Sequence, residues 1–404
     1  MLKLKRVEQI LLFLTILFLP TQLGKHFWPT FSFIYSLPID YLSPTFYFWD
    51  LLVVGLCLTF IWQKKHINRL AMNLLYLFIF TQAISLLGNG VNTGVGFVRL
   101  EQYLIAGFFG VYIASSKLAD IRLIVFLGLV LSITGEALLA IFQFLKGGTI
   151  GFWILGERTF SLSTPGIAKF DFYGSHFLRP YATFPHPNTL AGFLIIATLI
   201  LTCMKTAKSG VIATISKVAT FLGGLAILLT VSRVAILVSV ISVMVLVKKK
   251  GRVLLLILII VLLPILYTRF SSVFNFDNLT LIRREELSQV AFNLWLKSPL
   301  LGVGLNNFIP AASDLLLTGP SRFLQPVHNI FLLSLSETGL LGLLGLLTLL
   351  GYPIFKLSRL FKPYILLAWV VFIFLGMFDH YFLTLPQGYR LLFLLWGLSI
   401  SMLE

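Results

Sequence analysis

Residues 179–204 read RPYATFPHPNTLAGFLIIATLILTCM, in which an arginine, aromatic residues and a histidine lead directly into an apolar run. The run from Thr189 onward carries no charge and approaches the length of a bilayer crossing. Pro187 and Asn188 are typical of a helix start, with Asn188 as the simplest cap. Polar side chains therefore stand at the mouth of a membrane helix, where free backbone N–H groups attract anions.

The rest of the chain is equally apolar. Its 404 residues are 58% hydrophobic and 11% charged, with a mean hydropathy of +0.96. A soluble domain cannot bury that much apolar surface, so the sequence predicts a polytopic membrane protein. Cys57 and Cys203 fall inside apolar runs and are interpreted as small buried residues. The net charge of +16 fits the Lys and Arg bias of cytoplasmic loops and needs no nucleic-acid partner.

We expect an all-α fold that forms one integral membrane domain over residues 1–404. About twelve apolar runs approach the length of a transmembrane helix. They lie near 7–24, 46–63, 69–88, 97–115, 121–145, 186–204, 211–231, 233–247, 253–270, 329–355, 363–383 and 386–403.

The connectors predict the orientation of these helices. Short basic connectors hold more than half of the 31 Lys and Arg residues and are expected to be cytoplasmic, as are both termini. Their alternation with the other connectors requires a turn near Ser232-Arg233. The long loops 146–185 and 271–328 then face outward. The second, between helices 9 and 10, is expected to contain short amphipathic helices, one of them at 287–296.

Several arginines on the outer side are candidate anion ligands. Arg233 lies between apolar residues, where an arginine is costly unless it is paired or hydrated; the alternative is an arginine that reaches the lipid head groups. Arg179 offers a bidentate fork beside the helix start at Asn188. Arg283 and Arg284 adjoin two glutamates, so a solvated ion-paired face is the alternative there. Arg284 is the preferred ligand of the two.

Two histidines close the outer loops, each shortly before an asparagine at a helix start. His328 precedes Asn329, and His186 precedes Asn188. Because the free pKa of histidine lies near neutrality, His328 is the natural candidate for a general base; a simple capping role is the alternative. His186 is a candidate for polar lining. Glu337, about two turns into the next helix, is expected to pair with an outer arginine.

Three further stretches are less specific. GVGLNNF at 302–308 fits a tight turn that folds the outer loop over the membrane mouth. GLLGLLG at 339–345 fits a helix whose small residues allow close packing. Asp379, His380 and Tyr381 form a polar group that either lines a cleft or caps a helix.

The absences also inform the prediction. The outer loops carry no DxD pair and no His, Cys and carboxylate residues at metal-ligand spacing. The chain has no Walker, Rossmann or GxSxG signature. The outer side is instead rich in arginine, which predicts an anionic substrate handled without a metal or cofactor.

Four motifs in order resemble the O-antigen ligase and polymerase superfamily. They are RPYATFPHPN at 179–188, TVSRVA at 230–235, SPLLGVGLNNF at 298–308 and HNIFLLSLSETG at 328–339. The chain departs from the family pattern at Val234, where a glycine is common, and at Ser288, where an aromatic residue is common.

The resemblance implies a glycosyltransferase of the GT-C type. Such an enzyme moves a glycan from an undecaprenyl diphosphate carrier to a hydroxyl of a glycolipid or saccharide acceptor. The reaction takes place on the outer face of the bacterial cytoplasmic membrane, needs no metal and inverts the anomeric carbon. Arg179, Arg233 and Arg284 would bind the diphosphate, His328 would be the general base and Asn188 would shape the site.

Ligase activity is our leading interpretation, and polymerase and protein O-glycosylating activities share its chemistry. A transporter of lipid-linked oligosaccharide is the alternative from another class. Transporters often show internal repeats and charges at the membrane midplane, whereas this chain shows no repeat and its polar residues gather toward one face.

Overall fold

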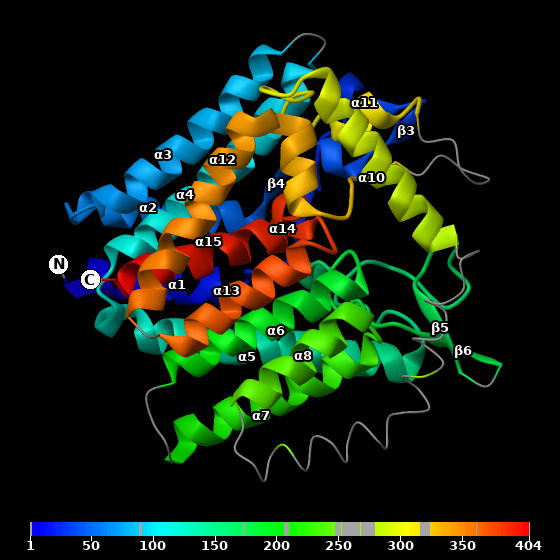
Figure 1. Cartoon of the computed structure of the whole chain (residues 1–404). Helices are drawn as coiled ribbons and strands as arrows, with labels where there is room; N and C mark the ends of the chain where they lie inside the picture. The colour runs from blue at the N-terminus through cyan, green and yellow to red at the C-terminus, as the bar shows by residue number, and fades with distance from the viewer. Residues whose placement is uncertain are drawn as a thin grey trace.

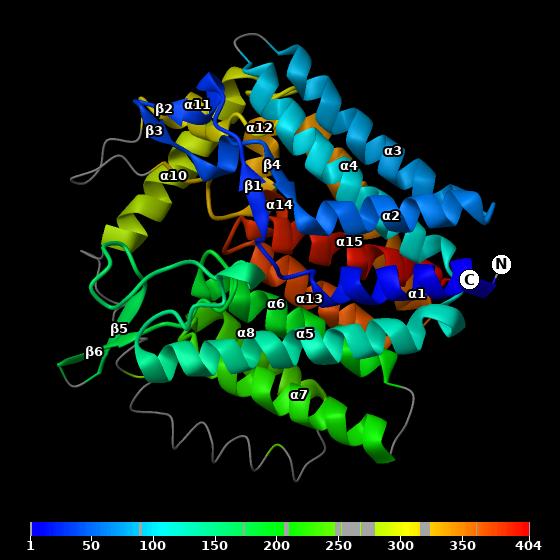
Figure 2. The same cartoon turned by 180° about the vertical axis from the view of Figure 1, so that it is seen from behind.

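The computed structural model describes residues 2–88, 91–172, 174–205, 210–246, 252, 267, 279–315, 324–360 and 362–403. It is predominantly helical, and the long helices lie side by side (Figures 1 and 2). The helices are α1 (Leu2–Leu17), α2 (Phe48–Trp62), α3 (Arg69–Ile84), α4 (Thr93–Ser115), α5 (Leu118–Lys146), α6 (Pro187–Met204), α7 (Gly210–Leu229), α8 (Arg233–Leu246), α10 (Leu279–Lys297), α11 (Phe308–Ala312), α12 (Ile330–Arg359), α13 (Pro363–Gly376), α14 (Tyr381–Thr384) and α15 (Pro386–Ser401).

The strands and 3-10 turns are short and lie in the loops. Three two-stranded antiparallel sheets pair Gly24 with Tyr47, Phe33 with Pro38 and Lys169 with Leu178. The strands are β1 (Gly24–His26), β2 (Phe33–Ile34), β3 (Leu37–Pro38), β4 (Thr45–Tyr47), β5 (Lys169–Phe172) and β6 (Ser175–Leu178), and the 3-10 turns are η1 (Thr30–Ser32), η2 (Asp40–Leu42), η3 (Ser85–Leu87) and η4 (Trp153–Leu155).

The two ends of the helical bundle differ in character. α1 begins and α15 ends at one end (Figure 1). The connectors that carry Lys64, Lys65 and Lys117 belong to the same end, as does the last turn of α12, which carries Lys356. We call this the basic end. The strands, α10 and α11 lie at the opposite end, which we call the site end (Figure 2).

Every predicted crossing that falls within the described residues contains a helix. Within the part of the chain that the structure describes, six helical stretches are long and apolar enough to cross a membrane, and three shorter helices are also apolar. The predicted crossing at 253–270 lies outside the described residues except for residue 267, and the count of twelve stays a prediction. The six stretches are Arg69–Leu87, Thr93–Ser115, Leu118–Lys146, Pro187–Met204, Gly210–Leu229 and Ile330–Arg359.

Three boundaries test the sequence prediction. The predicted turn near Ser232 is confirmed, because α7 ends at Leu229, α8 begins at Arg233 and Val231 has a positive φ of 48°. The first crossing was placed too far along the chain. Pro20 has no N–H and disfavours helix in the residue before it, so α1 ends at Leu17. The crossing at 363–383 is likewise interrupted, since α13 ends at Gly376.

The centre of the bundle is α15, which is buried along its whole length. It packs against α4, α6 and α12. At Gly397 an added Cβ would lie 2.4 Å from the carbonyl oxygen of Gly110 on α4, so the two helix backbones approach as only small residues permit. The fully buried Arg390 donates to the carbonyl oxygens of Leu19 (3.4 Å) and Thr21 (2.9 Å). It thereby ties the end of α1 to this core.

α12 is broken near its site end. Gly339 has φ 63° and ψ −165°, a conformation that is essentially restricted to glycine. The segment 299–304 fills the break and pairs with the freed backbone groups. Its hydrogen bonds run from Val303 N to Ser336 O (2.9 Å), from Gly304 N to Glu337 O (2.7 Å), from Leu340 N to Pro299 O (2.9 Å) and from Leu341 N to Leu300 O (3.3 Å).

This junction refines two sequence predictions. The glycines of the 302–308 motif do make a turn, with φ of 69° at Gly302 and 98° at Gly304. The turn docks into α12, where an added Cβ on Gly302 would lie 2.4 Å from the backbone carbon of Glu337. The stretch 339–345 lies within α12 as predicted, but the sequence did not predict the break at Gly339. The break there is tolerated because the docked segment satisfies the backbone in place of water.

The junction predicts a difference between two glycines of the same helix. Gly339→Ala should destabilise the fold by at least about 2 kcal/mol, because its φ is strained for alanine and its Cβ would lie 2.3 Å from the backbone of Leu300. Gly351→Ala is the matched control, since nothing lies within 4 Å of its Cβ position. Thermal unfolding in lipid nanodiscs measures both variants. Equal melting temperatures would contradict the role of the break.

Candidate active site

The candidate site is built around a group that we call the His–Asp–His cluster: His328, Asp379 and His380. One donor atom from each of the three side chains lies within 4.8 Å of the others. The rings of His328 and His380 have centroids 5.1 Å apart and meet edge to face at 71°. Thr384 Oγ1 lies 2.7 Å from Nδ1 of His380 and fixes the orientation of that ring. The cluster joins the loop before α12 to the connection between α13 and α14.

The end of α13 explains why the chain turns at this point. The two residues that follow its last residue, Gly376, leave their carbonyl groups without a helical partner, and two side chains from other elements satisfy them. Asn329 Nδ2 donates to Met377 O at 3.2 Å, and Arg284 Nη1 donates to Phe378 O at 3.3 Å. An arginine is favoured there because the helix C-terminus carries partial negative charge. Asp379 closes the turn by accepting the N–H of His380 at 2.9 Å.

Arg179 reaches the same region from the loop before α6. The residue is only 6% exposed. Its Nε donates to Thr230 O at 2.6 Å, and its Nη2 donates to Asn188 Oδ1 at 2.8 Å. Asn188 Nδ2 in turn lies 3.5 Å from Asp379 Oδ2. A polar chain therefore runs from Arg179 through Asn188 to the His–Asp–His cluster.

The same contact positions Arg233. Thr230 belongs to the turn between α7 and α8, so Arg179 is anchored on the turn that presents Arg233 as the first residue of α8. Arg233 is partly buried, and the charge of Arg284 acts on its guanidinium group in addition to that burial. Two like charges held together in a partly buried position favour binding of an anion between them.

The histidines at the site are held neutral. Burial lowers the pKa of His328 to about 4 and that of His380 to about 3. Burial also lowers the pKa of His186 to about 3, with the charge of Arg179 as the second cause. Burial alone would raise the pKa of Asp379, but His328, His380 and Arg284 together hold this pKa below its ordinary value. At neutral pH the site therefore contains neutral imidazoles, an ionised Asp379 and arginines.

The two helix starts differ from each other, although their sequences are similar. Asn329 caps α12 as expected, since its Oδ1 accepts from the N–H groups of Phe331 (2.9 Å) and Leu332 (3.0 Å). The cap expected from Asn188 is supplied by His186 instead. His186 Nδ1 accepts the N–H of Asn188 at 3.1 Å. Asn188 is thus released to bridge Arg179 and Asp379.

Glu337 lies at the α12 junction. Its Oε1 accepts the N–H of Phe308 at 3.2 Å, and the nearby positive charge is that of Arg99. Its carboxylate thus binds the start of α11, shortly after the segment that fills the break in α12. The expected pairing with an arginine of the site is replaced by proximity to Arg99, which the sequence analysis did not single out.

Two buried arginines were missed by the sequence analysis. Arg99 donates to Thr384 O (2.8 Å) and to Asn306 Oδ1 (3.2 Å). It therefore joins α4 to the residue that contacts His380 and to the chain just after the docked segment. Arg390 supports the end of α1. Both stand in apolar stretches, and an arginine within a predicted membrane helix is the signal that would have found them.

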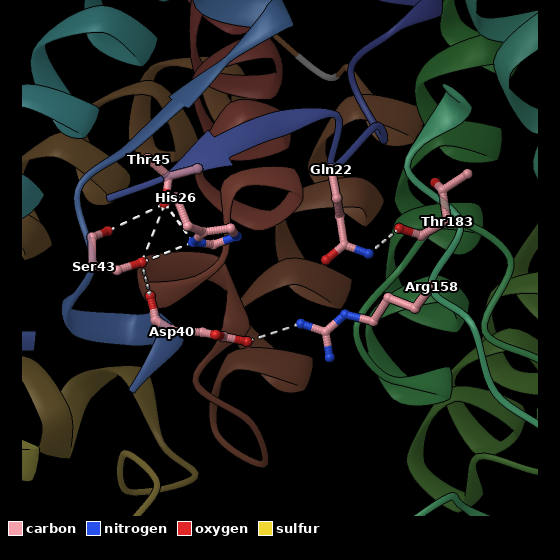
Figure 3. A network of polar contacts seen from close by, with 7 residues as sticks. All are labelled: Gln22, His26, Asp40, Ser43, Thr45, Arg158 and Thr183. Carbon is pink, nitrogen blue, oxygen red and sulfur yellow. Dashed lines mark hydrogen bonds and ion pairs between the residues drawn. The ribbon is translucent and has the colours of Figure 1, made fainter. Parts of the chain in front are cut away.

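A second polar network covers the cluster from the N-terminal segment. Tyr41 meets the ring of His380 at 5.6 Å between centroids. Beside it, Asp40 pairs with Arg158 at 3.0 Å, and Gln22 donates to the carbonyl oxygen of Thr183 (Figure 3). Both contacts join the N-terminal segment to the loop 146–185, whose end carries Arg179.

The His–Asp–His cluster also contains the donor types that bind Zn²⁺. Sequence spacing does not reveal this grouping, because residue 328 and residues 379–380 come together only in the folded chain. His380 already has one ring nitrogen bound to Thr384, and the charge of Arg284 acts on all three members of the cluster. A positive charge nearby disfavours binding of a second cation.

The fold and the site define a class of protein: a helical membrane protein whose arginines, neutral histidines and one carboxylate gather at helix ends on one side. Within the chain, residues 218–347 match the family described as O-antigen ligase. This match bears out the resemblance to the O-antigen ligase and polymerase superfamily and supports a glycosyltransferase role of that type. A search among curated proteins finds no match.

The buried neutral histidines predict acid sensitivity. Their folded pKa values lie below the unfolded value of about 6.5, so their stabilisation is complete above pH 6.5 and is lost as the pH falls toward 4. A change from pH 7 to pH 5 should lower the free energy of unfolding by on the order of 1–2 kcal/mol for each histidine. His186→Asn retains a capping side chain and should reduce the fall in melting temperature over this range.

His66→Asn is the control for that experiment, because His66 is exposed at the basic end. The fall in melting temperature of this variant should equal that of the wild type. If His186→Asn were as acid-sensitive as the wild type, His186 would not be a buried neutral cap.

Proposed function

We propose that the protein is a glycosyltransferase that moves a glycan from an undecaprenyl diphosphate carrier to an acceptor hydroxyl, with O-antigen ligase as its activity. The observation that carries this proposal is the convergence of His328 and Asp379 with Arg284 and the Arg179–Asn188 pair. A base, an acid partner and several cations in one place suit the displacement of an anionic leaving group.

The arginines bind the diphosphate in this proposal. Arg233 and Arg284 repel each other in the absence of an anion, and a diphosphate between them relieves that repulsion. Arg179 and the start of α6 add a third positive contact. As the bond between the anomeric carbon and the phosphate oxygen breaks, negative charge grows on the leaving group. The same arginines stabilise that charge, so they act on the transition state as well as on binding.

His328 activates the acceptor. The neutral imidazole accepts the proton of the acceptor hydroxyl. As it does so, the hydroxyl oxygen attacks the anomeric carbon from the face opposite the diphosphate. The new glycosidic bond forms as the old bond breaks, so the configuration is inverted. A pKa of about 4 is low for a base, but a bound diphosphate adds negative charge nearby and raises it. Asp379 stabilises the imidazolium that results.

No metal takes part in this proposal. The charge of the leaving group is carried by the arginines, and the charge of Arg284 disfavours a divalent cation at the His–Asp–His cluster. Asp379 also lies in the polar chain from Asn188, which is a role distinct from metal binding.

The proposed membrane placement follows from the charges of the two ends. The basic end faces the cytoplasm of a bacterial cell, and both termini lie there. The site end faces the outer side of the cytoplasmic membrane. The proposed architecture is GT-C-like, with twelve crossings and the active site among the outer loops. The donor then reaches the arginines laterally, because its diphosphate stays at the membrane surface while its polyprenyl tail stays in the lipid.

A transfer assay tests the proposal. Protein in lipid vesicles is given an undecaprenyl-diphosphate glycan and a core-lipid acceptor in the presence of EDTA. Wild type should transfer the glycan. His328→Ala should lower the rate by about a hundredfold or more, which is the usual effect of losing a general base. Arg284→Ala and Arg233→Ala should lower the rate by a similar factor, because each removes a charge that stabilises the leaving diphosphate.

Two residues at the basic end serve as controls, since His66→Ala and Arg359→Ala should leave transfer unchanged. Transfer to a second donor molecule would assign the polymerase activity instead of the ligase activity. Activity that EDTA abolishes and Zn²⁺ restores would overturn the metal-free chemistry. Movement of the lipid-linked substrate across the bilayer without any transfer would overturn the assignment as a transferase and favour a transporter.

A further inference from the structure

The loop that follows α5 exposes a short apolar turn. Phe152 is 48% exposed, Trp153 72%, Ile154 58% and Leu155 39%. The last three form η4, and the whole stretch 147–156 contains no charged residue. Four large apolar side chains on one turn are unfavourable in water, and nothing in the proposed transfer reaction uses them.

The turn is held rigidly in this exposed conformation. The carboxylate of Glu157 accepts three backbone N–H groups, from Ile150 (2.8 Å), Gly151 (2.8 Å) and Phe152 (2.5 Å). Gln143 Nε2 adds a fourth hydrogen bond, at 2.8 Å. Glu157 is only 6% exposed, so these bonds form out of water, where bonds to a charged group are strong. The turn therefore cannot easily fold its apolar side chains inward.

The position of the turn relative to the helices follows from its contacts. Gln143 lies one turn before the end of α5 at Lys146, so the bond to Glu157 shows that the loop folds back along α5. Thr21 Oγ1, just beyond α1, donates to Leu155 O at 2.8 Å. The apolar turn therefore stands beside the site-end tips of α1 and α5, level with the last turn of the membrane-crossing segment of α5.

The neighbouring surface of α5 is apolar as well. Its exposed residues Leu131, Leu138, Phe142 and Leu145 recur at helical spacing, as expected of a face in contact with lipid. Leu145 is 72% exposed, in the last turn before the loop. An apolar surface that faces lipid along a crossing helix thus continues at its tip into four more apolar side chains.

We infer that the turn Phe152–Leu155 inserts into the interfacial region of the bilayer leaflet at the site end, with lipid acyl chains as its partner. Tryptophan and phenylalanine are the residues that prefer this depth. The turn belongs to the loop 146–185, which also contains Arg179. Inserting the turn fixes that loop, and the arginine with it, relative to the lipid head groups. The inference rests on the membrane placement and not on the transfer chemistry.

Spin labelling measures the depth of the turn directly. Trp153→Cys, in a chain with Cys57→Ala and Cys203→Ala, is labelled with a nitroxide in vesicles of phosphatidylethanolamine and phosphatidylglycerol. Two accessibilities of the label are measured, one to oxygen and one to a polar nickel complex. The ratio of the first to the second should be several-fold higher at residue 153 than at Ser163→Cys, an exposed polar position of the same loop. It should approach the ratio at Leu145→Cys.

A second measurement uses the protein with both native cysteines. Lipids brominated near the head group should quench the emission of Trp153, obtained as the difference between wild type and Trp153→Phe. Equal accessibility ratios at residues 153 and 163, or absence of quenching, would overturn the inference. Dipolar broadening of the label at residue 153 would also overturn it, because a second copy of the chain would then cover the turn. Neither readout depends on activity, so a failure here is distinct from a failure of the transfer assay.

Discussion

At membrane depth a backbone N–H or carbonyl group has no water to bind, so the protein must supply its partner. The principal features of this structure meet that requirement. The break in α12 at Gly339 is filled by the segment 299–304. The carbonyl groups of Met377 and Phe378, just beyond α13, accept from Asn329 and Arg284. Arg390 does the same for the chain that leaves α1. These substitutes for water join elements that are far apart in the sequence.

The candidate site follows from the same requirement. Helix ends and breaks gather at the site end, and the side chains that satisfy them are arginines, asparagines and histidines. Arg284 supports the end of α13 and so stands beside Asp379. Arg179 supports the turn before α8 and so lies near Arg233. Positive charge is therefore concentrated where neutral histidines and a carboxylate also converge. An anionic substrate at the membrane surface would complete this arrangement.

Local features were predictable from the sequence. The apolar runs gave the helices within the described residues, and the basic connectors required the turn that α7 and α8 show at Val231. The four motifs contain His328 and two of the arginines, Arg179 and Arg233. Pairings between distant residues were not predictable, because periodicity and spacing describe only neighbours along the chain. The motifs at 298–308 and 328–339 were recognised separately, yet the structure shows that they interlock at Gly302 and Gly339.

The same limit applies within the site. The sequence identified Asn188 as a cap because asparagine is a common capping residue, whereas His186 takes that position and Asn188 binds Arg179. For Asp379 and His380 the sequence left two roles open, the lining of a cleft and the capping of a helix. Their proximity to His328 depends on how α12, α13 and α14 pack. Tertiary contacts therefore decided the roles of residues that local patterns had only brought to attention.

A structure of the protein in lipid with bound undecaprenyl diphosphate tests the central claim most directly. The account predicts the two phosphates between Arg233 and Arg284, with Arg179 in contact. His328 would face the position of the anomeric carbon, with no metal ion between the phosphates and Asp379. A diphosphate bound away from these arginines, or one bridged to the His–Asp–His cluster by a metal ion, would contradict it.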